Sequence, residues 1–211
     1  QLVLSRVIEP LINEMYKDEF DGDRFRLVCV EFPIKKEENN QSTAVDFLLL
    51  NTKCCIFLEL KTNSNSFDKK QFDRYKELQN KIRNKGGSFL FDDLYSLMNN
   101  SQCSKKYNYL INKIKEKNLD FTSIEDALII YIAPKEMGKI FKSEDVIFYS
   151  FSDLYAISTV LGGEAQFITK EFSKLDTLDR DLDIYNDEIN RANPEELEIL
   201  PDLKEILNHM Q

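Results

Sequence analysis

Hydrophobic residues recur at two spacings along the chain, and each spacing predicts one kind of element. Near the N-terminus, apolar residues three and four positions apart predict an amphipathic helix over residues 2–17. Pro10 lies inside this pattern, so the helix either begins near it or kinks there. Residues 25–32 read as a strand that Pro33 ends, and the polar segment 35–43 reads as a loop.

Two further strands are predicted over residues 44–50 and 54–60, and the short polar segment Asn51-Thr52-Lys53 between them indicates a β-hairpin. The later pattern predicts helix over 68–84 and 89–118, strands over 127–133 and 146–151, and a helix capped by Ser152 that runs to about Leu161.

This order of elements predicts an α/β fold in which a central mixed sheet is flanked by helices. Gly162-Gly163 interrupts the pattern, and the sequence beyond it has helical spacing and becomes increasingly acidic. We therefore expect one domain over residues 1–163. An acidic helical C-terminal extension over residues 164–211 would be packed on this domain or appended to it.

The net charge is −9, but the charge is unevenly distributed. Residues 62–118 hold 12 basic and 6 acidic side chains, whereas residues 176–211 hold 11 acidic and 3 basic. A uniformly acidic chain would argue against nucleic acid, but here the middle of the chain offers phosphates a local basic surface. The acidic end is either a plain appendage or a segment that covers the basic helix or docks a partner.

Composition excludes several other classes of protein. No apolar run approaches the roughly 18 residues needed to cross a bilayer, and the first residues lack a signal-peptide layout. We therefore expect a cytoplasmic protein with no membrane partner. The four cysteines form no CxxC pair and His209 is the single histidine, which disfavours structural zinc. The adjacent Cys54 and Cys55 should point to opposite faces of their strand as buried reduced thiols.

The predicted hairpin carries the candidate chemistry. In its second strand, Glu59 and Lys61 are two residues apart and therefore point to the same face at the strand's end. In its first strand, Asp46 interrupts an apolar run, where an acid is costly unless it is paired, hydrated or bound to metal. A loop at Thr52-Lys53 places Asp46 opposite Glu59, and a loop at Asn51-Thr52 places it on the diagonal.

Two carboxylates this close repel unless one takes up a proton or a cation binds between them. Mg²⁺ prefers hard oxygen ligands and keeps several waters beside one or two carboxylates and substrate phosphates. A neighbouring lysine orients or deprotonates a water, or neutralises charge that grows on a phosphate. These residue types therefore suit hydrolysis of a phosphodiester, although a Glu-x-Lys by itself is more often a solvated salt bridge.

The order of these residues resembles a known family. Asp46, then Glu59-Leu60-Lys61, then Gln71-Phe72-Asp73-Arg74-Tyr75 is similar to the PD-(D/E)XK nuclease superfamily, and the Gln-x-x-x-Tyr is similar to its RecB-type branch. The resemblance spans about residues 2–80, and Val45 departs from it because the family motif has proline before the aspartate.

The resemblance implies a restriction-endonuclease-like αβββαβ core. It implies that Asp46 and Glu59 bind Mg²⁺ or Mn²⁺ and that Lys61 works on the attacking water. Gln71 and Tyr75 would brace the site or touch substrate. It also implies an acid from the first helix, for which Glu9 is the first choice and Glu14 the second.

The helix after the hairpin carries Lys69, Lys70 and Arg74, which either hold backbone phosphates or form a solvated face. The expected function is therefore a magnesium-dependent nuclease acting on DNA. The alternative is a non-catalytic nucleic-acid-binding or assembly module that retains the fold. A protein partner or a homo-oligomer is compatible with both.

Overall fold

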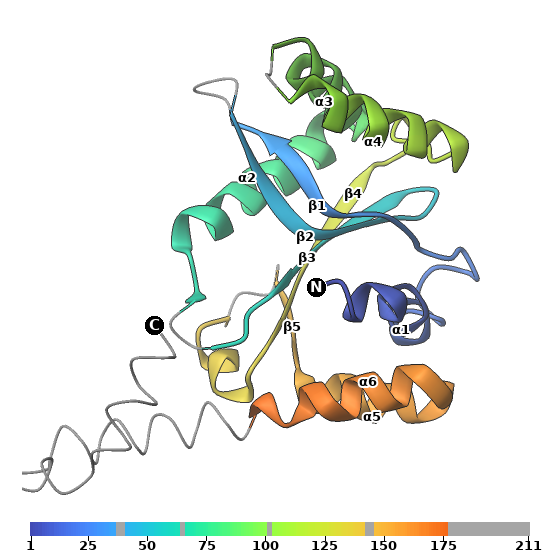
Figure 1. Ribbon diagram of the computed structural model, residues 1–211, viewed down its shortest axis with the longest axis vertical. Helices are drawn as coiled ribbons and strands as arrows, with labels where there is room; N and C mark the ends of the chain where they lie inside the picture. The colour runs from blue at the N-terminus through green and yellow to red at the C-terminus, as the bar shows by residue number, and fades with distance from the viewer. Residues whose placement is uncertain (37–40, 64–65, 101–102, 142–145, 177–211) are drawn as a thin grey trace, which may run out of the picture.

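The computed structural model describes residues 1–36, 41–63, 66–100, 103–141 and 146–176. Within them, a five-stranded mixed sheet lies between two layers of helices (Figure 1). The strands are β1 (Arg26–Lys35), β2 (Ser42–Leu50), β3 (Cys54–Leu60), β4 (Asp126–Ala133) and β5 (Ile147–Ser150). The helices are η1 (Leu4–Arg6), α1 (Ile8–Met15), α2 (Lys69–Lys85), α3 (Ser88–Asn100), α4 (Ser104–Glu116), η3 (Lys135–Lys139), α5 (Phe151–Leu161) and α6 (Gly163–Ser173).

The strands lie in the sheet in the order in which they occur in the chain. β1, β2 and β3 are antiparallel neighbours, whereas β3, β4 and β5 run parallel to one another. The parallel step from β3 to β4 is made through α2, α3 and α4, as parallel strands require a long crossover. The predicted α/β class and the mixed sheet flanked by helices are therefore confirmed.

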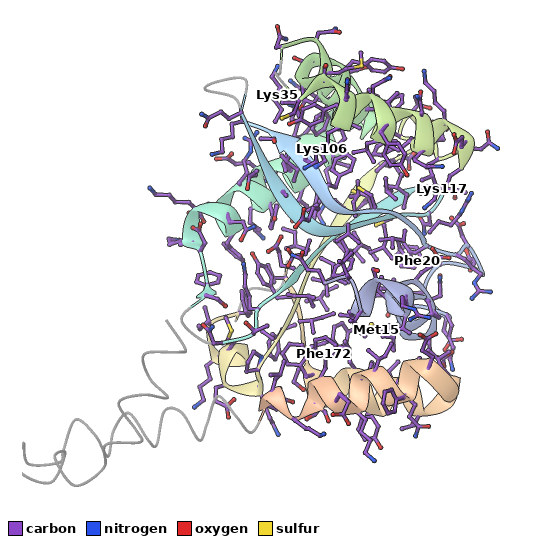
Figure 2. The ribbon with its side chains drawn as sticks, viewed as in Figure 1. Met15, Phe20, Lys35, Lys106, Lys117 and Phe172 are labelled. Carbon is purple, nitrogen blue, oxygen red and sulfur yellow. The ribbon has the colours of Figure 1, made fainter. Side chains whose placement is uncertain are left out.

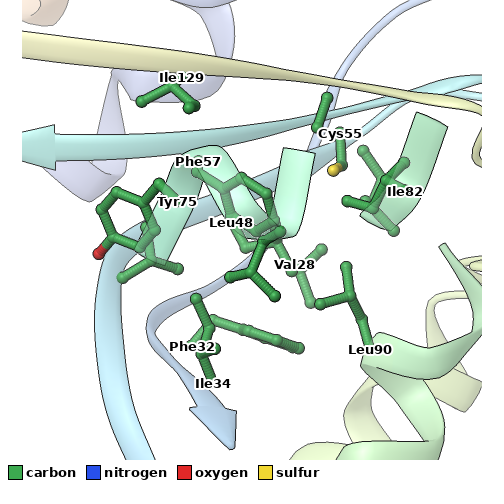
Figure 3. Close-up of a cluster of buried hydrophobic side chains, with 14 of the residues drawn as sticks. Val28, Phe32, Ile34, Leu48, Cys55, Phe57, Tyr75, Ile82, Leu90 and Ile129 are labelled. Atoms are coloured by element: carbon green, nitrogen blue, oxygen red, sulfur yellow. The ribbon is translucent and has the colours of Figure 1, made fainter. Parts of the chain in front are cut away.

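A separate apolar cluster covers each face of the sheet. Side chains of α2, α3 and α4 pack on one face with Cys55 and Phe57 of β3, and Figure 3 shows part of this cluster. Side chains of α1, α5 and α6 pack on the other face with Cys54 and Ile56. The opposite orientation and burial predicted for Cys54 and Cys55 are thus confirmed, and both thiols are free.

Both ends of α2 are fixed by local chemistry. The carboxylate of Asp68 caps the helix by accepting hydrogen bonds from the backbone amides of Lys70 (2.8 Å) and Gln71 (3.3 Å). The helix ends at Gly86, whose φ of 76° lies in the left-handed region that glycine tolerates best. These two signals set where α2 begins and where it ends.

Several predicted boundaries were wrong. β1 continues through Pro33 to Lys35, because β1 is an edge strand and an edge tolerates a residue without a backbone donor. The cap of α5 is Ser150 rather than Ser152, since Ser150 forms a reciprocal capping box with Asp153. At the N-terminus, α1 spans only Ile8–Met15 of the predicted 2–17. The expected alternative that the helix begins near Pro10 is confirmed, since Pro10 lies in the first turn, where its missing N–H costs nothing.

The region predicted as helix over 89–118 divides into α3 and α4. Helical structure after Gly162 is confirmed over α6, which buries Ala165 and Ile168 against the sheet. The rest of the expected acidic extension, from residue 177 and including His209, lies outside the described residues. No helix in the described ranges is long and apolar enough to cross a membrane.

Candidate active site

The hairpin register brings Asp46 beside Glu59. Phe47 pairs with Leu58 and Leu50 with Cys55, so the loop is Thr52-Lys53, the first of the two registers considered. The regular pairing of β2 with β3 ends at Phe47 and Leu58. Beyond it, the two strands are joined by hydrogen bonds between side-chain carboxylates and backbone amides. The backbone amide of Asp46 donates to Glu59 Oε1 (3.2 Å), and the amide of Leu60 donates to Asp46 Oδ2 (2.8 Å).

The backbone around Asp46 explains why its carboxylate reaches the gap between β2 and β3. Val45 packs in the cluster under α2, whereas Phe47 packs in the cluster on the opposite face. Regular alternation would place these two residues on one face, so β2 changes face at Asp46. In the neighbouring strand β1, Glu31 lies opposite Asp46 and has an irregular backbone conformation, with a φ of 54°.

Glu59 is the most enclosed member of the pair, with 1% of its surface exposed. Its Oε1 accepts a hydrogen bond from the Tyr75 hydroxyl (2.5 Å), and its Oε2 accepts one from Lys61 Nζ (3.1 Å). The Lys61 ammonium also donates to Gln71 Oε1 (2.9 Å). Gln71 Nε2 donates in turn to the Tyr75 hydroxyl (3.0 Å). The four side chains form a closed ring.

This ring depends on helical spacing in α2. Gln71 and Tyr75 are four residues apart and therefore lie above one another on the same helix face. The Tyr75 ring stacks on Phe57 with centroids 5.8 Å apart, and Figure 3 shows it at the margin of the apolar cluster. The helix thus anchors Tyr75 in the core and presents its hydroxyl to Glu59.

The surroundings of Asp46 and Glu59 raise the pKa of both carboxyl groups. Burial raises the pKa of Glu59, and the nearby charge of Asp46 raises it further, against the opposing effects of Tyr75 and Lys61. Burial also raises the pKa of Asp46, although the Leu60 amide and the Lys61 charge oppose this. Both ionised carboxylates therefore carry a cost in the protein alone that a bound cation would remove.

Tyr131 of β4 is a residue of this region that the sequence reading missed. It is the parallel neighbour of Glu59 in the sheet and is fully buried. Burial raises its pKa, and the charges of Glu59, Asp68 and Asp46 raise it further. Among the described residues, its hydroxyl has no hydrogen-bond partner. The available signal was a tyrosine within the otherwise apolar run 127–133.

The two candidate acids of the first helix are not brought to the pair. Glu9 Oε2 accepts a hydrogen bond from the backbone amide of Leu27 (2.8 Å), at the start of β1. Glu14 forms an ion pair with Lys17 (2.8 Å) at the surface. Within the part of the chain that the structure describes, no group of three or more His, Cys, Asp or Glu side chains converges as a metal site.

The three predicted phosphate-binding residues divide into two groups. Lys69 and Lys70 are exposed on the first turn of α2, where Lys69 lies 3.5 Å from Asp73. Arg74 instead reaches the end of β1, where its Nη2 donates to the carbonyl oxygen of Lys35 (2.9 Å). The structure therefore separates Arg74 from the two lysines that precede it.

The two buried tyrosines beside Glu59 allow a matched test of this geometry. We expect Tyr75→Phe to lower the free energy of unfolding by about 1–3 kcal/mol, because a buried Glu59 oxygen and Gln71 both lose a partner. Tyr131→Phe should leave stability unchanged or raise it, because its hydroxyl makes no hydrogen bond to the described residues. Urea unfolding at constant m-value measures both, and equal losses would contradict the hydrogen-bond assignment.

Comparison of the chain with protein family models, curated proteins and solved structures finds no match. The functional argument therefore stands on the geometry of the site.

Proposed function

We propose that this protein is a divalent-metal-dependent nuclease that hydrolyses DNA phosphodiester bonds, with a PD-(D/E)XK type of site. One observation carries the proposal: Asp46, Glu59 and Lys61 converge at one end of the hairpin through direct contacts. A solvated salt bridge would not require the reciprocal bonds between the two strands, nor the buried Glu59.

The order of elements supports the same proposal. One helix, three antiparallel strands, helices and then a parallel strand follow one another as α1, β1–β3, α2–α4 and β4. This order agrees with the αβββαβ core that the sequence resemblance implies. The Tyr75 side chain of α2 also contacts Glu59, and the Gln71 side chain contacts Lys61.

The donor set fits a hard cation that keeps part of its water shell. Asp46 and Glu59 would hold Mg²⁺ or Mn²⁺, with waters and substrate phosphate as the other ligands. Burial raises the pKa of both carboxyl groups, and the charge of Asp46 raises the pKa of Glu59 further, so ionising the pair is costly without a cation. When bound, the metal would act as a Lewis acid and lower the pKa of a water.

The remaining steps belong to the chain's own side chains. Glu59 and Gln71 hold the Lys61 ammonium from two sides, which fixes its direction and excludes most of its rotamers. From there, Lys61 would orient the attacking water or balance the charge that grows on the phosphate. Tyr75 donates to Glu59 and so positions the carboxylate for its metal-binding role. Lys69 and Lys70 would contact the DNA backbone.

One observation favours the second candidate, a nucleic-acid-binding or assembly module without catalysis. No third acidic side chain joins Asp46 and Glu59 in the described ranges. A site with only two carboxylates depends more on substrate phosphates to complete its metal shell.

The direct test is metal-dependent cleavage. Purified protein with Mg²⁺ or Mn²⁺ should nick supercoiled plasmid or degrade labelled oligonucleotides, and EDTA should abolish the activity. Glu14→Gln is a matched control, because Glu14 forms a surface ion pair away from the hairpin. This variant should cleave DNA like wild type. If single-stranded, duplex and branched DNA all remain intact with both metals, the binding-module candidate replaces the nuclease.

A further inference from the structure

A second cationic feature lies where the end of β1 meets α2 and α3. An open pocket of about 240 Å³ is lined there by Lys35 and Lys36 from β1 and its exit, Arg74 and Lys81 from α2, and Asp93 from α3. Figure 2 shows Lys35 at this end of β1, close to α3. The lining contains four basic side chains and one acid, in a chain whose net charge is −9.

Three of the four cationic groups are held in place by contacts of their own. Lys35 Nζ donates to the Ser96 hydroxyl (2.7 Å), and Arg74 is fixed between the Lys35 carbonyl oxygen and Glu77. The Lys81 ammonium lies 4.0 Å from the centre of the Phe89 ring, in a cation–π contact. Binding an anion here would therefore cost little side-chain entropy.

Asp93 explains how the protein tolerates this concentration of like charge. The charges of Lys81, Lys35 and Arg74 all act on its carboxylate, although burial acts more strongly and raises its pKa. Asp93 in the pocket and Glu77, which pairs with Arg74, balance two of the four cations, so an excess of positive charge remains. An anion that enters would lower this repulsion between the cations.

We propose that this pocket binds a phosphate of the nucleic-acid strand and acts as a second anchoring point beside the cleavage site. The inference rests on the proposed function, because the same helix carries both sites. Gln71 contacts Lys61 and Tyr75 contacts Glu59, whereas Arg74, within the same turn of α2, lines the pocket. A strand bound in the pocket would be held next to Glu59 and Lys61.

Binding in the absence of divalent metal separates anchoring from cleavage. Fluorescence anisotropy with a labelled oligodeoxynucleotide, single-stranded or duplex, is measured in EDTA at several salt concentrations. Lys35→Gln and Lys81→Gln should each weaken binding. Each should also make the fall of log K, the association constant, with log salt concentration less steep by about 1. Asp93→Asn should tighten binding several-fold, a change that partial unfolding would not produce. Lys170→Gln on α6, on the opposite face of the sheet, should bind like wild type.

The inference is wrong if wild type binds neither single-stranded nor duplex DNA in EDTA. It is also wrong if the pocket variants bind with the wild-type affinity and the wild-type dependence on salt. Metal-dependent cleavage by wild type in that case would leave the nuclease proposal standing. Altered binding by the Lys81 and Asp93 variants without any cleavage would support the pocket and overturn the nuclease instead.

Discussion

Replacing Lys61 by methionine should lower metal-dependent DNA cleavage by at least about 100-fold, the effect expected when a positioned charge is lost from a transition state. Methionine matches the unbranched stem of lysine as far as Cε and lacks the ammonium. That ammonium is held by Glu59 (3.1 Å) and Gln71 (2.9 Å), and its side chain is only 11% exposed, so no solvent cation replaces it easily. The loss should appear in kcat.

The protein should remain folded, because burial raises the pKa of Glu59, which can take up a proton when the Lys61 charge is lost, and Glu59 keeps the Tyr75 hydrogen bond. The matched control is Lys53→Met, at the opposite, exposed end of the same hairpin, which should cleave like wild type. Thermal melting followed by circular dichroism checks both variants. A folded Lys61→Met protein with wild-type activity would remove lysine from the mechanism.

The Asp46→Asn variant should be more stable than wild type without metal and less stable than wild type with metal. Without metal, the variant should be more stable by about 0.5–2 kcal/mol, as is usual when a costly functional charge is removed. Asparagine still offers an oxygen to the Leu60 amide, and it no longer repels Glu59. With Mn²⁺ at 100 times its Kd, wild type should gain about 2.7 kcal/mol and the variant nothing.

The same pair of acids sets the pH dependence of stability without metal. Because burial raises the pKa of both Asp46 and Glu59, the folded protein binds more protons than the unfolded chain above about pH 4. Their contribution to stability therefore falls as pH rises from the ordinary carboxyl pKa through the raised values. Asp46→Asn should flatten this fall, because one of the two groups no longer titrates.

Urea unfolding across this pH range, with EDTA or with Mn²⁺, measures both effects. Asp120→Asn is an opposite control, because hydrogen bonds from Thr122 lower the pKa of Asp120. This variant should lose stability above about pH 4 and should respond to Mn²⁺ like wild type. If Mn²⁺ stabilises Asp46→Asn as much as wild type, Asp46 is not a ligand.

The candidate site was predictable to the extent that it depends on local periodicity. The two-residue spacing of Glu59 and Lys61 and the four-residue spacing of Gln71 and Tyr75 each fix a shared face, whatever the rest of the fold does. The hairpin loop limited Asp46 to two registers, and the structure has the first. Tyr131 was missed because its sheet neighbour Glu59 is more than 70 positions away in the chain.

Sequence alone determined the α/β class, the kind of element that most segments form and the identity of the ionisable residues at the end of the hairpin, because these follow from side-chain chemistry and from the repeat of helix and strand. Only the tertiary structure decided where those groups point. The change of face in β2 at Asp46, the turn of Glu9 toward the Leu27 amide and the meeting of Lys35, Lys81 and Asp93 all depend on contacts between distant segments. Such contacts depend on packing and burial of the whole chain, which no local pattern specifies.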